Sequence, residues 1–287
     1  MKLIRQSFEI CNQTDFSIKG IKQFIEKCAR VSYKSEDKMT DSSYEKFVNM
    51  LIKRDHTRPL EFGTVYLSMP WNVWEDIKNE LITNEIYNDI WVKWQCEEYV
   101  VHITTNYRYI LQWINNENIE SFNEDIFNQY FTETPNKFHY PRYTVHFILD
   151  RGIMDEFRTH ISLSHLAEST RYCNYSKDKF NNELTFIQPD WLSDEDIIDY
   201  EKKNEHHPIF AMLKRAEQDY LTLTNNGFYP QQARIVLPLG IKSELISCGF
   251  SDAWDNFFYR RNANDAHPMA REIAKPLNEE FIKNEYI

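Results

Sequence analysis

Hydrophobic residues recur with helical spacing in some segments of this chain and with strand-like alternation in others. Apolar positions three and four residues apart predict helices over Ile18–Arg30 and Ser42–Lys53. Runs of β-branched and aromatic residues predict strands over Thr64–Met69 and Glu98–Thr104. The clearest alternation lies in Arg142–Leu149, whose odd-numbered residues share one face and are apolar or aromatic.

After a turn at Asp150-Arg151-Gly152, the rest of the chain has a helical pattern. One helix is predicted from about Ile153 to Ser169. The ends of four more are marked by proline, serine or glycine: Pro208–Asn226 before Gly227, Pro230–Leu237, Ser251–Arg261 and a last helix that begins at Pro268. Helices flanking one sheet of mixed strand order predict the α+β class.

No internal repeat and no linker rich in Pro, Gly and Ser divides the chain. We therefore expect a single domain over residues 1–287. The polar stretch Asn115–Asn128 predicts a loop-like insertion around residues 110–135, and Ser193–His207 predicts a second, acidic connection.

Composition excludes several classes of protein. A hydrophobic content of 42% with 15% aromatic residues is too high for a disordered chain. The net charge of 33 − 44 = −11 argues against a general binder of nucleic acid or of membrane surfaces. The sequence has no run of about 18 apolar residues, so no membrane helix is expected. The first residues turn polar too soon for a signal peptide. Six scattered glycines exclude the Rossmann and Walker loops. Five cysteines without a C-x-x-C pair favour a reducing cytoplasm.

The segment after the Asp150 turn carries the most informative polar side chains. Within the predicted helix, three of them stack at i, i+4 and i+8 on one face: Glu156, His160 and Ser164. At its end, Ser169, Arg171 and Tyr172 add a hydroxyl, a guanidinium and a phenol, which suit a phosphate and a base edge. On spacing alone, a helix with a solvated polar face remains an alternative.

Two other segments are candidates for a site. Arg234 stands in the apolar frame Pro230–Pro238, where an arginine is often partly buried and needs an anionic partner. That partner is either a ligand or an acid in an internal salt bridge. The charged run Arg54–Phe62 belongs to a site or is an ordinary loop. Histidine and carboxylate spacings near His160 supply no convincing third ligand, so no catalytic metal is expected.

Taken in order, these segments resemble the flavin-dependent thymidylate synthases from about His56 to the C-terminus. The family pattern R-H-R-x-x-S, followed by S-x-R-Y, is matched by Ser164, Ser169, Arg171 and Tyr172. Further blocks of the family are echoed at His56–Phe62, Thr104–Arg108, Ala233–Pro238, Asn256–Arg261 and Ala266–Pro268.

The resemblance implies a homotetramer with active sites at subunit interfaces, which converts dUMP to dTMP by reductive methylation. Methylenetetrahydrofolate would supply the carbon, NADPH the electrons, and FAD would carry the hydride. The residues implied to bind dUMP are Glu156, Ser169, Arg171, Tyr172 and Arg234. Those implied to contact FAD are His56, Arg58, His160 and Asn256. Arg261 is implied to be catalytic, lying by the uracil and polarising it toward ionisation at N3.

This chain departs from the family pattern in the flavin half. The departures are Phe62, Thr159, Ile161 and Ala167, where the family has a histidine, the two arginines of R-H-R, and a carboxylate or amide. Arg158 comes one position early, which on a helix is a rotation of about 100°. Arg58 occupies the place of a short hydroxyl, and its guanidinium is a candidate replacement for the lost pyrophosphate contact.

Three functions are compatible with these departures. The first is dUMP methylation with an altered flavin site. The second is a diverged enzyme that modifies a pyrimidine nucleotide. The third is a non-catalytic nucleotide-binding or assembly protein on the same fold.

Overall fold

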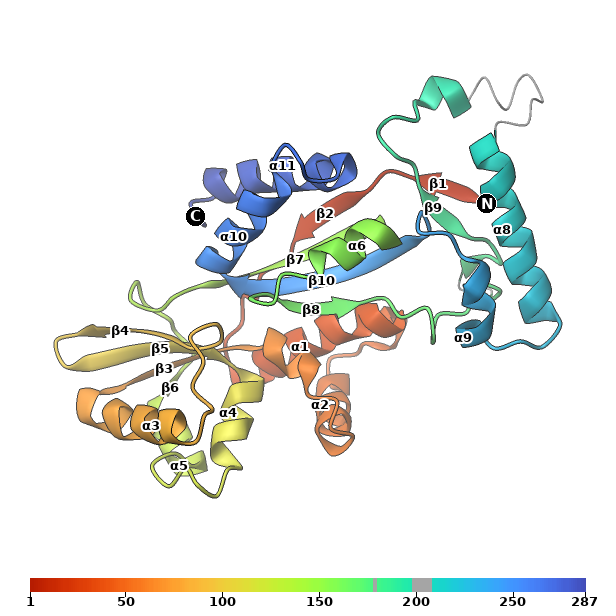
Figure 1. Ribbon diagram of the computed structural model, residues 1–287. Coiled ribbons are helices and arrows are strands. Elements are labelled where there is room, and N and C mark those ends of the chain that lie inside the picture. Colours follow the sequence, from red (N-terminus) through yellow and green to blue (C-terminus); the bar gives the residue numbers. More distant parts are fainter. Residues whose placement is uncertain (178–179, 198–207) are drawn as a thin grey trace.

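The computed structural model describes residues 1–177, 180–197 and 208–287 (Figure 1). The described helices are α1 (Ile18–Tyr33), α2 (Ser43–Lys53), α3 (Trp71–Thr83), α4 (Tyr107–Ile114), α5 (Glu124–Tyr130), α6 (Arg151–Phe157), α8 (Pro208–Asn225), α9 (Pro230–Ala233), α10 (Ser251–Arg261) and α11 (Pro268–Lys283), with the 3₁₀ helices η1 (Glu36–Lys38), η2 (Arg58–Phe62) and η4 (Arg234–Val236). The described strands are β1 (Lys2–Ile4), β2 (Ser7–Ile10), β3 (Thr64–Pro70), β4 (Lys93–Glu97), β5 (Val100–Asn106), β6 (Phe131–Thr132), β7 (Arg142–Asp150), β8 (Ser164–Ala167), β9 (Thr185–Ile187) and β10 (Lys242–Phe250).

The central sheet has the strand order β2-β7-β10-β8, and each neighbouring pair is antiparallel. Its odd-numbered β7 residues pack against α6, α10 and α11 in a core that includes Trp254, Phe257 and Phe281. On the opposite face, Leu166 and Ile246 pack against α1. Figure 1 shows α10 and α11 on one side of the sheet and α1 on the other. The central sheet is therefore covered by helices on both faces.

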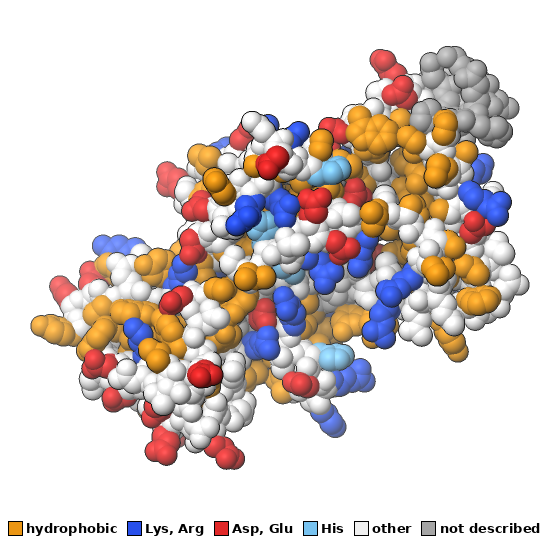
Figure 2. All heavy atoms as spheres, in the orientation of Figure 1, with side chains coloured by type: hydrophobic (Ala, Val, Ile, Leu, Met, Phe, Trp, Pro, Cys, Tyr) orange, Lys and Arg blue, Asp and Glu red, His pale blue; other side chains and the backbone are white. Residues whose placement is uncertain are grey.

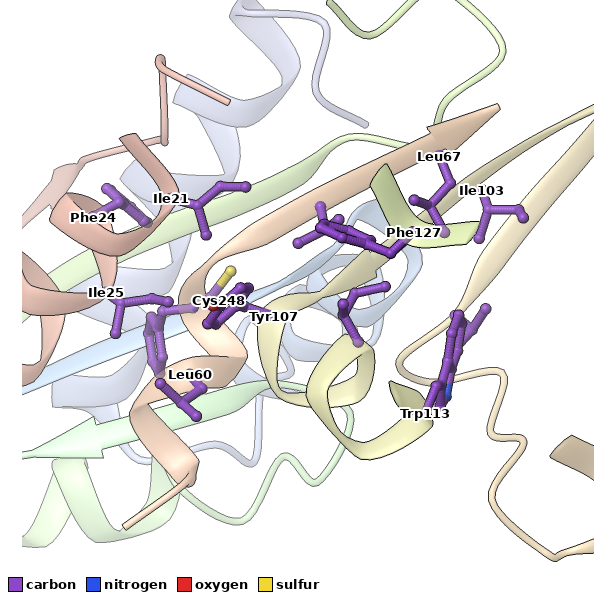
Figure 3. Close-up of a cluster of buried hydrophobic side chains, with 14 of the residues drawn as sticks. Ile21, Phe24, Ile25, Leu60, Leu67, Ile103, Tyr107, Trp113, Phe127 and Cys248 are labelled. Carbon is purple, nitrogen blue, oxygen red and sulfur yellow. The ribbon is translucent and has the colours of Figure 1, made fainter. Parts of the chain in front are cut away.

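A second antiparallel sheet, β4-β5-β3-β6, lies beside the first. Its apolar face packs on α3, α4 and α5 through buried aromatic residues such as Trp74 and Trp113. Figure 3 shows how this core continues into the central sheet, because side chains of α1, β3, β5 and α4 lie together with Cys248 of β10. Burial of this shared apolar surface fastens the second sheet to the first.

A short parallel pair, β1 with β9, brings the first residues of the chain next to residues 185–187. Tyr175 and Phe186 pack there with Tyr220 of α8 in a third apolar cluster. Ala233 of α9 belongs to the same cluster. This packing holds α9 and η4 beside the loop that follows β8.

The α+β class is confirmed, as are the predicted helices at α1, α2, α8, α10 and α11 and the alternation of β7. The expectation of one mixed sheet is wrong, because the described strands form two antiparallel sheets and a parallel pair.

The stretch Asn115–Asn128 is not a loop throughout, since Asn123 caps α5 by accepting from the Ile126 N–H at 3.0 Å. The single domain stays a prediction, and the connection Ser193–His207 lies outside the described residues from position 198. No described helix is long and apolar enough to cross a membrane.

The predicted helix from Ile153 to Ser169 is wrong beyond Phe157. The helix begins where expected, because the Asp150 carboxylate accepts from the Ile153 N–H at 2.7 Å. It ends at Phe157, after which the Thr159 hydroxyl donates to the Glu156 carbonyl at 2.7 Å. Hydroxyl side chains that compete for backbone acceptors in this way disfavour helix.

The residues that follow form strand β8, in which Ser164 pairs with Cys248 of β10. The Ser164 hydroxyl donates to Glu61 at 2.8 Å. Ser164 therefore does not share a helix face with Glu156 and His160. The rotation expected for Arg158 also does not apply, because residues 158–163 are not helical.

Candidate functional site

Five arginines from distant parts of the chain line one cavity of about 510 Å³: Arg58, Arg151, Arg158, Arg171 and Arg234. We call it the arginine cavity. Ser32 and Tyr33 at the end of α1, strand β8 and the segment Glu168–Tyr172 complete its walls. Figure 2 shows Lys and Arg side chains gathered on this face, around α6 and β8 and toward α9.

Strand order brings these arginines together. Strands β7 and β8 flank β10, and both run antiparallel to it. Their carboxyl ends therefore lie at the same end of the sheet as the first residues of β10. Arg151 follows β7, Arg171 follows β8, and Arg234 precedes β10. Arg58 opens η2, which packs against β8. The cavity is therefore a product of the sheet's topology.

The arginine cavity has an excess of positive charge. Arg151 and Arg158 both pair with Asp155, at 3.4 and 3.2 Å. Among the described residues, no acid forms an ion pair with Arg58, Arg171 or Arg234. Glu168 is the one acidic residue in the lining, and its side chain pairs instead with Lys242. In a chain of net charge −11, this local excess marks a place for an anion such as a phosphate.

A second cavity of about 450 Å³ adjoins the first and is lined by His56, Arg58 and Arg108. We call it the His56 cavity. Arg58 and Tyr33 line both cavities. The Tyr33 ring lies 5.8 Å from that of Tyr172, centroid to centroid. The two cavities can thus hold a planar group on one side of Arg58 and a charged group on the other.

Arg261 belongs to a separate cluster, in which it joins the end of α10 to the segment after α6. Its Nε donates to His160 Nε2 at 2.9 Å and its Nη1 to Glu156 Oε2 at 2.9 Å. Its Nη2 donates to the Glu156 carbonyl at 2.7 Å and to Thr159 Oγ1 at 3.0 Å. Glu156 and Arg261 line an open hollow of about 1210 Å³ over α10 and α11. Four of the five N–H groups of Arg261 are thus used in internal hydrogen bonds.

Two histidines beside these sites are held neutral. Burial, with a smaller effect of Arg261 and Arg260, lowers the pKa of His160 to about 4. Because Arg261 donates to Nε2, the His160 ring carries its proton on Nδ1. Burial likewise lowers the pKa of His165 to about 4. Its ring contacts the Ser247 hydroxyl at 2.8 Å and the His160 carbonyl at 2.9 Å.

Acidification from pH 6.5 to pH 5 is expected to destabilise the protein. In this range the unfolded chain binds protons at both histidines and the folded chain does not. As the pH is lowered through this range, the free energy of unfolding therefore decreases by up to about 1.4 kcal/mol per pH unit for each histidine. Urea unfolding across this range measures the slope. His165→Gln should reduce this slope, and a flat profile would contradict the assignment.

The structure divides the candidate residues into two groups. One surrounds the two joined cavities: His56, Arg58, Ser169, Arg171, Tyr172 and Arg234. The other lies at α6 and α10: Glu156, His160, Asn256 and Arg261. Asn256 is exposed on α10.

The expectation that Arg234 is partly buried is wrong. It is exposed, and its Nη1 lies 3.4 Å from the Thr170 hydroxyl. Arg234 also forms no internal salt bridge with any described acid, which was the alternative to a ligand. Sequence analysis missed Arg151, which it treated only as part of a turn, and Tyr33, whose one signal was its place at a helix end. The described residues contain no group of three His, Cys, Asp or Glu side chains placed to hold a metal ion.

Comparison with known proteins identifies the family. The sequence model of the thymidylate synthase complementing protein family matches residues 95–284, and the chain belongs to this family. No curated protein matches the sequence. Similar solved structures include a UMP/dUMP methylase, PolB from Streptomyces cacaoi, bound with 5-Br UMP, at TM-score 0.43 and 14% identity over 99% of this chain and 92% of that one. The same enzyme bound with 5-Br dUMP has TM-score 0.42 and 15% identity over 99% of this chain and 93% of the other.

Proposed function

We propose that this protein methylates dUMP to dTMP. The observation that carries the proposal is the arginine cavity, in which three guanidinium groups without a described acid partner surround Ser169 and Tyr172. A nucleotide monophosphate supplies the missing negative charge, and a pyrimidine supplies a ring for the tyrosines. Membership of the thymidylate synthase complementing protein family supports the same substrate class.

In this proposal each side chain has a defined task. Arg171 and Arg234 bind the phosphate, because a guanidinium pairs with two phosphate oxygens at once. The Ser169 hydroxyl adds a short donor. Tyr172, with Tyr33 beside it, packs against the uracil ring.

The His56 cavity has the donors that a phosphate-bearing cofactor needs. Its lining includes His56 and Arg58, and the Arg108 guanidinium is held by Glu61. FAD, if bound there, supplies the hydride chemistry, with methylenetetrahydrofolate as carbon donor and NADPH as reductant. The chain's own residues bind and orient these groups.

We further propose that the second group of residues completes the site from another copy of the chain. Glu156, His160, Asn256 and Arg261 lie outside both joined cavities of their own subunit. A homotetramer with sites at subunit interfaces would bring the two groups together. Sedimentation with and without dUMP tests this assembly, and a monomer under both conditions would contradict it.

The proposed function is tested first by the absorbance of the purified protein and then by its reaction. Flavin bands, together with dTMP formed from dUMP, methylenetetrahydrofolate and NADPH, are the expected results. A colourless protein that still binds dUMP supports the non-catalytic alternative. A coloured protein that alters another pyrimidine nucleotide supports the diverged enzyme.

Arg58→Ser is expected to abolish flavin retention. Arg58 lines both cavities, has no described acid partner and stands in a chain that lacks the two family arginines at positions 159 and 161. Removing it takes away a charge-assisted contact of about 1.5–3 kcal/mol. The flavin-to-protein absorbance ratio after gel filtration measures retention.

Arg54→Ser is the matched control for this experiment, because Arg54 is exposed nearby and lines neither cavity. Restoring Thr159→Arg and Ile161→Arg in the Arg58→Ser background is expected to recover binding chiefly through position 161. Ile161 is exposed, whereas an arginine at position 159 would meet Arg261. Unchanged flavin occupancy in Arg58→Ser would show that Arg58 does not compensate for the missing arginines.

A further inference from the structure

A buried row of alternating charges lies directly behind the arginine cavity. It consists of Lys34, Glu244, Lys242 and Glu168. Lys34 and Lys242 both pair with Glu244, and Lys242 Nζ lies 3.0 Å from Glu168 Oε2. The side chains are between 0% and 15% exposed, with Glu168 fully buried. The two cations and two carboxylates balance, as buried charges must if they are to remain ionised.

The two carboxylates hold Lys242 in its charged form. Burial alone would lower the pKa of Lys242, but Glu168 and Glu244 together raise it. Burial would also raise the pKa of Glu244, yet His146 and the two lysines bring it well below its usual range. Lys242 and Glu244 are therefore both ionised at neutral pH.

Glu168 belongs both to this row and to the wall of the cavity. It lines the cavity, and its carbonyl accepts from Arg151 Nη1 at 3.3 Å. Its carboxylate points away, with one oxygen bonded to Lys242 and the other to the Tyr175 hydroxyl at 3.0 Å. The Arg151 guanidinium thus contacts the backbone of Glu168, whereas the Glu168 carboxylate is bonded to Lys242 and Tyr175.

If Lys242 were removed, the Glu168 carboxylate would lose the cation that holds it in this position. A buried carboxylate that loses its cation seeks the next one, and Arg151 already touches the same residue. The carboxylate would then cancel one positive charge of the arginine cavity and compete with a bound phosphate. Lys242 itself is not part of the cavity wall.

We propose that Lys242 is a positioning residue that holds the Glu168 carboxylate out of the arginine cavity and thereby sets the cavity's affinity for phosphate. The inference rests on the proposed function only for the identity of the nucleotide. The charge argument holds for any phosphate-bearing ligand.

A double-variant comparison tests the proposal. Calorimetric titration with dUMP, and separately with inorganic phosphate, is carried out on the wild type, Lys242→Met, Glu168→Gln and the double variant. Lys242→Met should weaken binding about 30-fold, the effect of one added charge at roughly 8 Å and an effective dielectric constant near 20. Glu168→Gln should bind at least as tightly as the wild type, and the double variant should return to within about threefold of it.

The rescue separates this role from a merely structural one. If Lys242 only supported the fold, binding would follow the free energy of unfolding across these variants, measured in urea, whereas the proposed role predicts weak binding by fully folded Lys242→Met. Lys34→Met is the matched control, because Lys34 pairs with Glu244 and not with Glu168. It should leave phosphate binding unchanged. Wild-type affinity in Lys242→Met, or a double variant as weak as Lys242→Met, overturns the proposal.

A second variant tests the proposal if Lys242→Met does not fold. Tyr175→Phe removes the other bond that restrains Glu168 and changes no charge. It should weaken phosphate binding about threefold, with recovery when Glu168→Gln is added. Unchanged binding in Tyr175→Phe overturns the proposal.

The two ligands also separate this inference from the proposed function. A wild type that binds inorganic phosphate but not dUMP contradicts dUMP methylation, while the phosphate titrations still decide the role of Lys242. A wild type that binds neither overturns the role of Lys242, because the cavity would not be an anion site.

Discussion

Arg261→Ala is expected to lower the free energy of unfolding by about 2–4 kcal/mol. The guanidinium makes four hydrogen bonds that tie α10 to the segment between α6 and β8. Its removal leaves the buried Nε2 of His160 without a donor and Glu156 without its cation. Solvent can hydrate the half-exposed Glu156, which keeps the effect below that of a fully buried pair.

Thermal unfolding measures this loss, and a decrease in Tm of about 3–7 °C corresponds to it in a chain of this size. Arg260→Ala is the matched control, because Arg260 is adjacent and exposed. An unchanged Tm in Arg261→Ala would show that these hydrogen bonds are not maintained in solution. If Arg261 also acts on the uracil in the assembled enzyme, the folded variant should bind dUMP normally and turn over more slowly.

Arg171→Ala and Arg234→Ala are each expected to weaken dUMP binding by about 1.5–3 kcal/mol, or roughly tenfold to 150-fold. Both guanidinium groups line the arginine cavity without a described acid partner, so each is available to the phosphate. Their removal should change the fold little, because Arg171 and Arg234 are both exposed.

Calorimetry with dUMP and with deoxyuridine distinguishes a phosphate contact from a general loss of affinity. The binding of deoxyuridine, which has no phosphate, should be unaffected in both variants. Arg215→Ala on α8 is the control, because Arg215 pairs with Asp219 and lies outside the cavity. Wild-type dUMP affinity in either cavity variant would remove that arginine from the phosphate site.

The sequence predicts those features of the fold that depend on local pattern. The alternation in β7 and the spacing in α1 are properties of neighbouring residues, and both elements are found where expected. The segment after Phe157 is different. Its apolar residues suit either a helix or a strand, and the choice is made by pairing with β10, about 80 residues away.

The candidate site shows the same division between local and distant information. The family motifs indicate Ser169, Arg171 and Arg234, which the structure brings to one cavity. No motif indicates that Arg151 joins them, because its place depends on the strand order β7-β10-β8. The importance of Lys242 is equally hidden, since its partner Glu168 lies 74 residues earlier in the chain.

The convergence of β7, β8 and the start of β10 has a consequence for folding. Residues 58 and 234 line one cavity only after these strands have paired, so no short fragment of the chain contains the whole arginine cavity. Contacts of such large sequence separation form slowly, because loop-closure entropy opposes them. A nucleotide that occupies this cavity would therefore bind the finished fold and not its precursors. At a concentration of 100 Kd such a ligand would shift the unfolding equilibrium by about 2.7 kcal/mol, so that the proposed substrate would itself protect newly folded protein from unfolding.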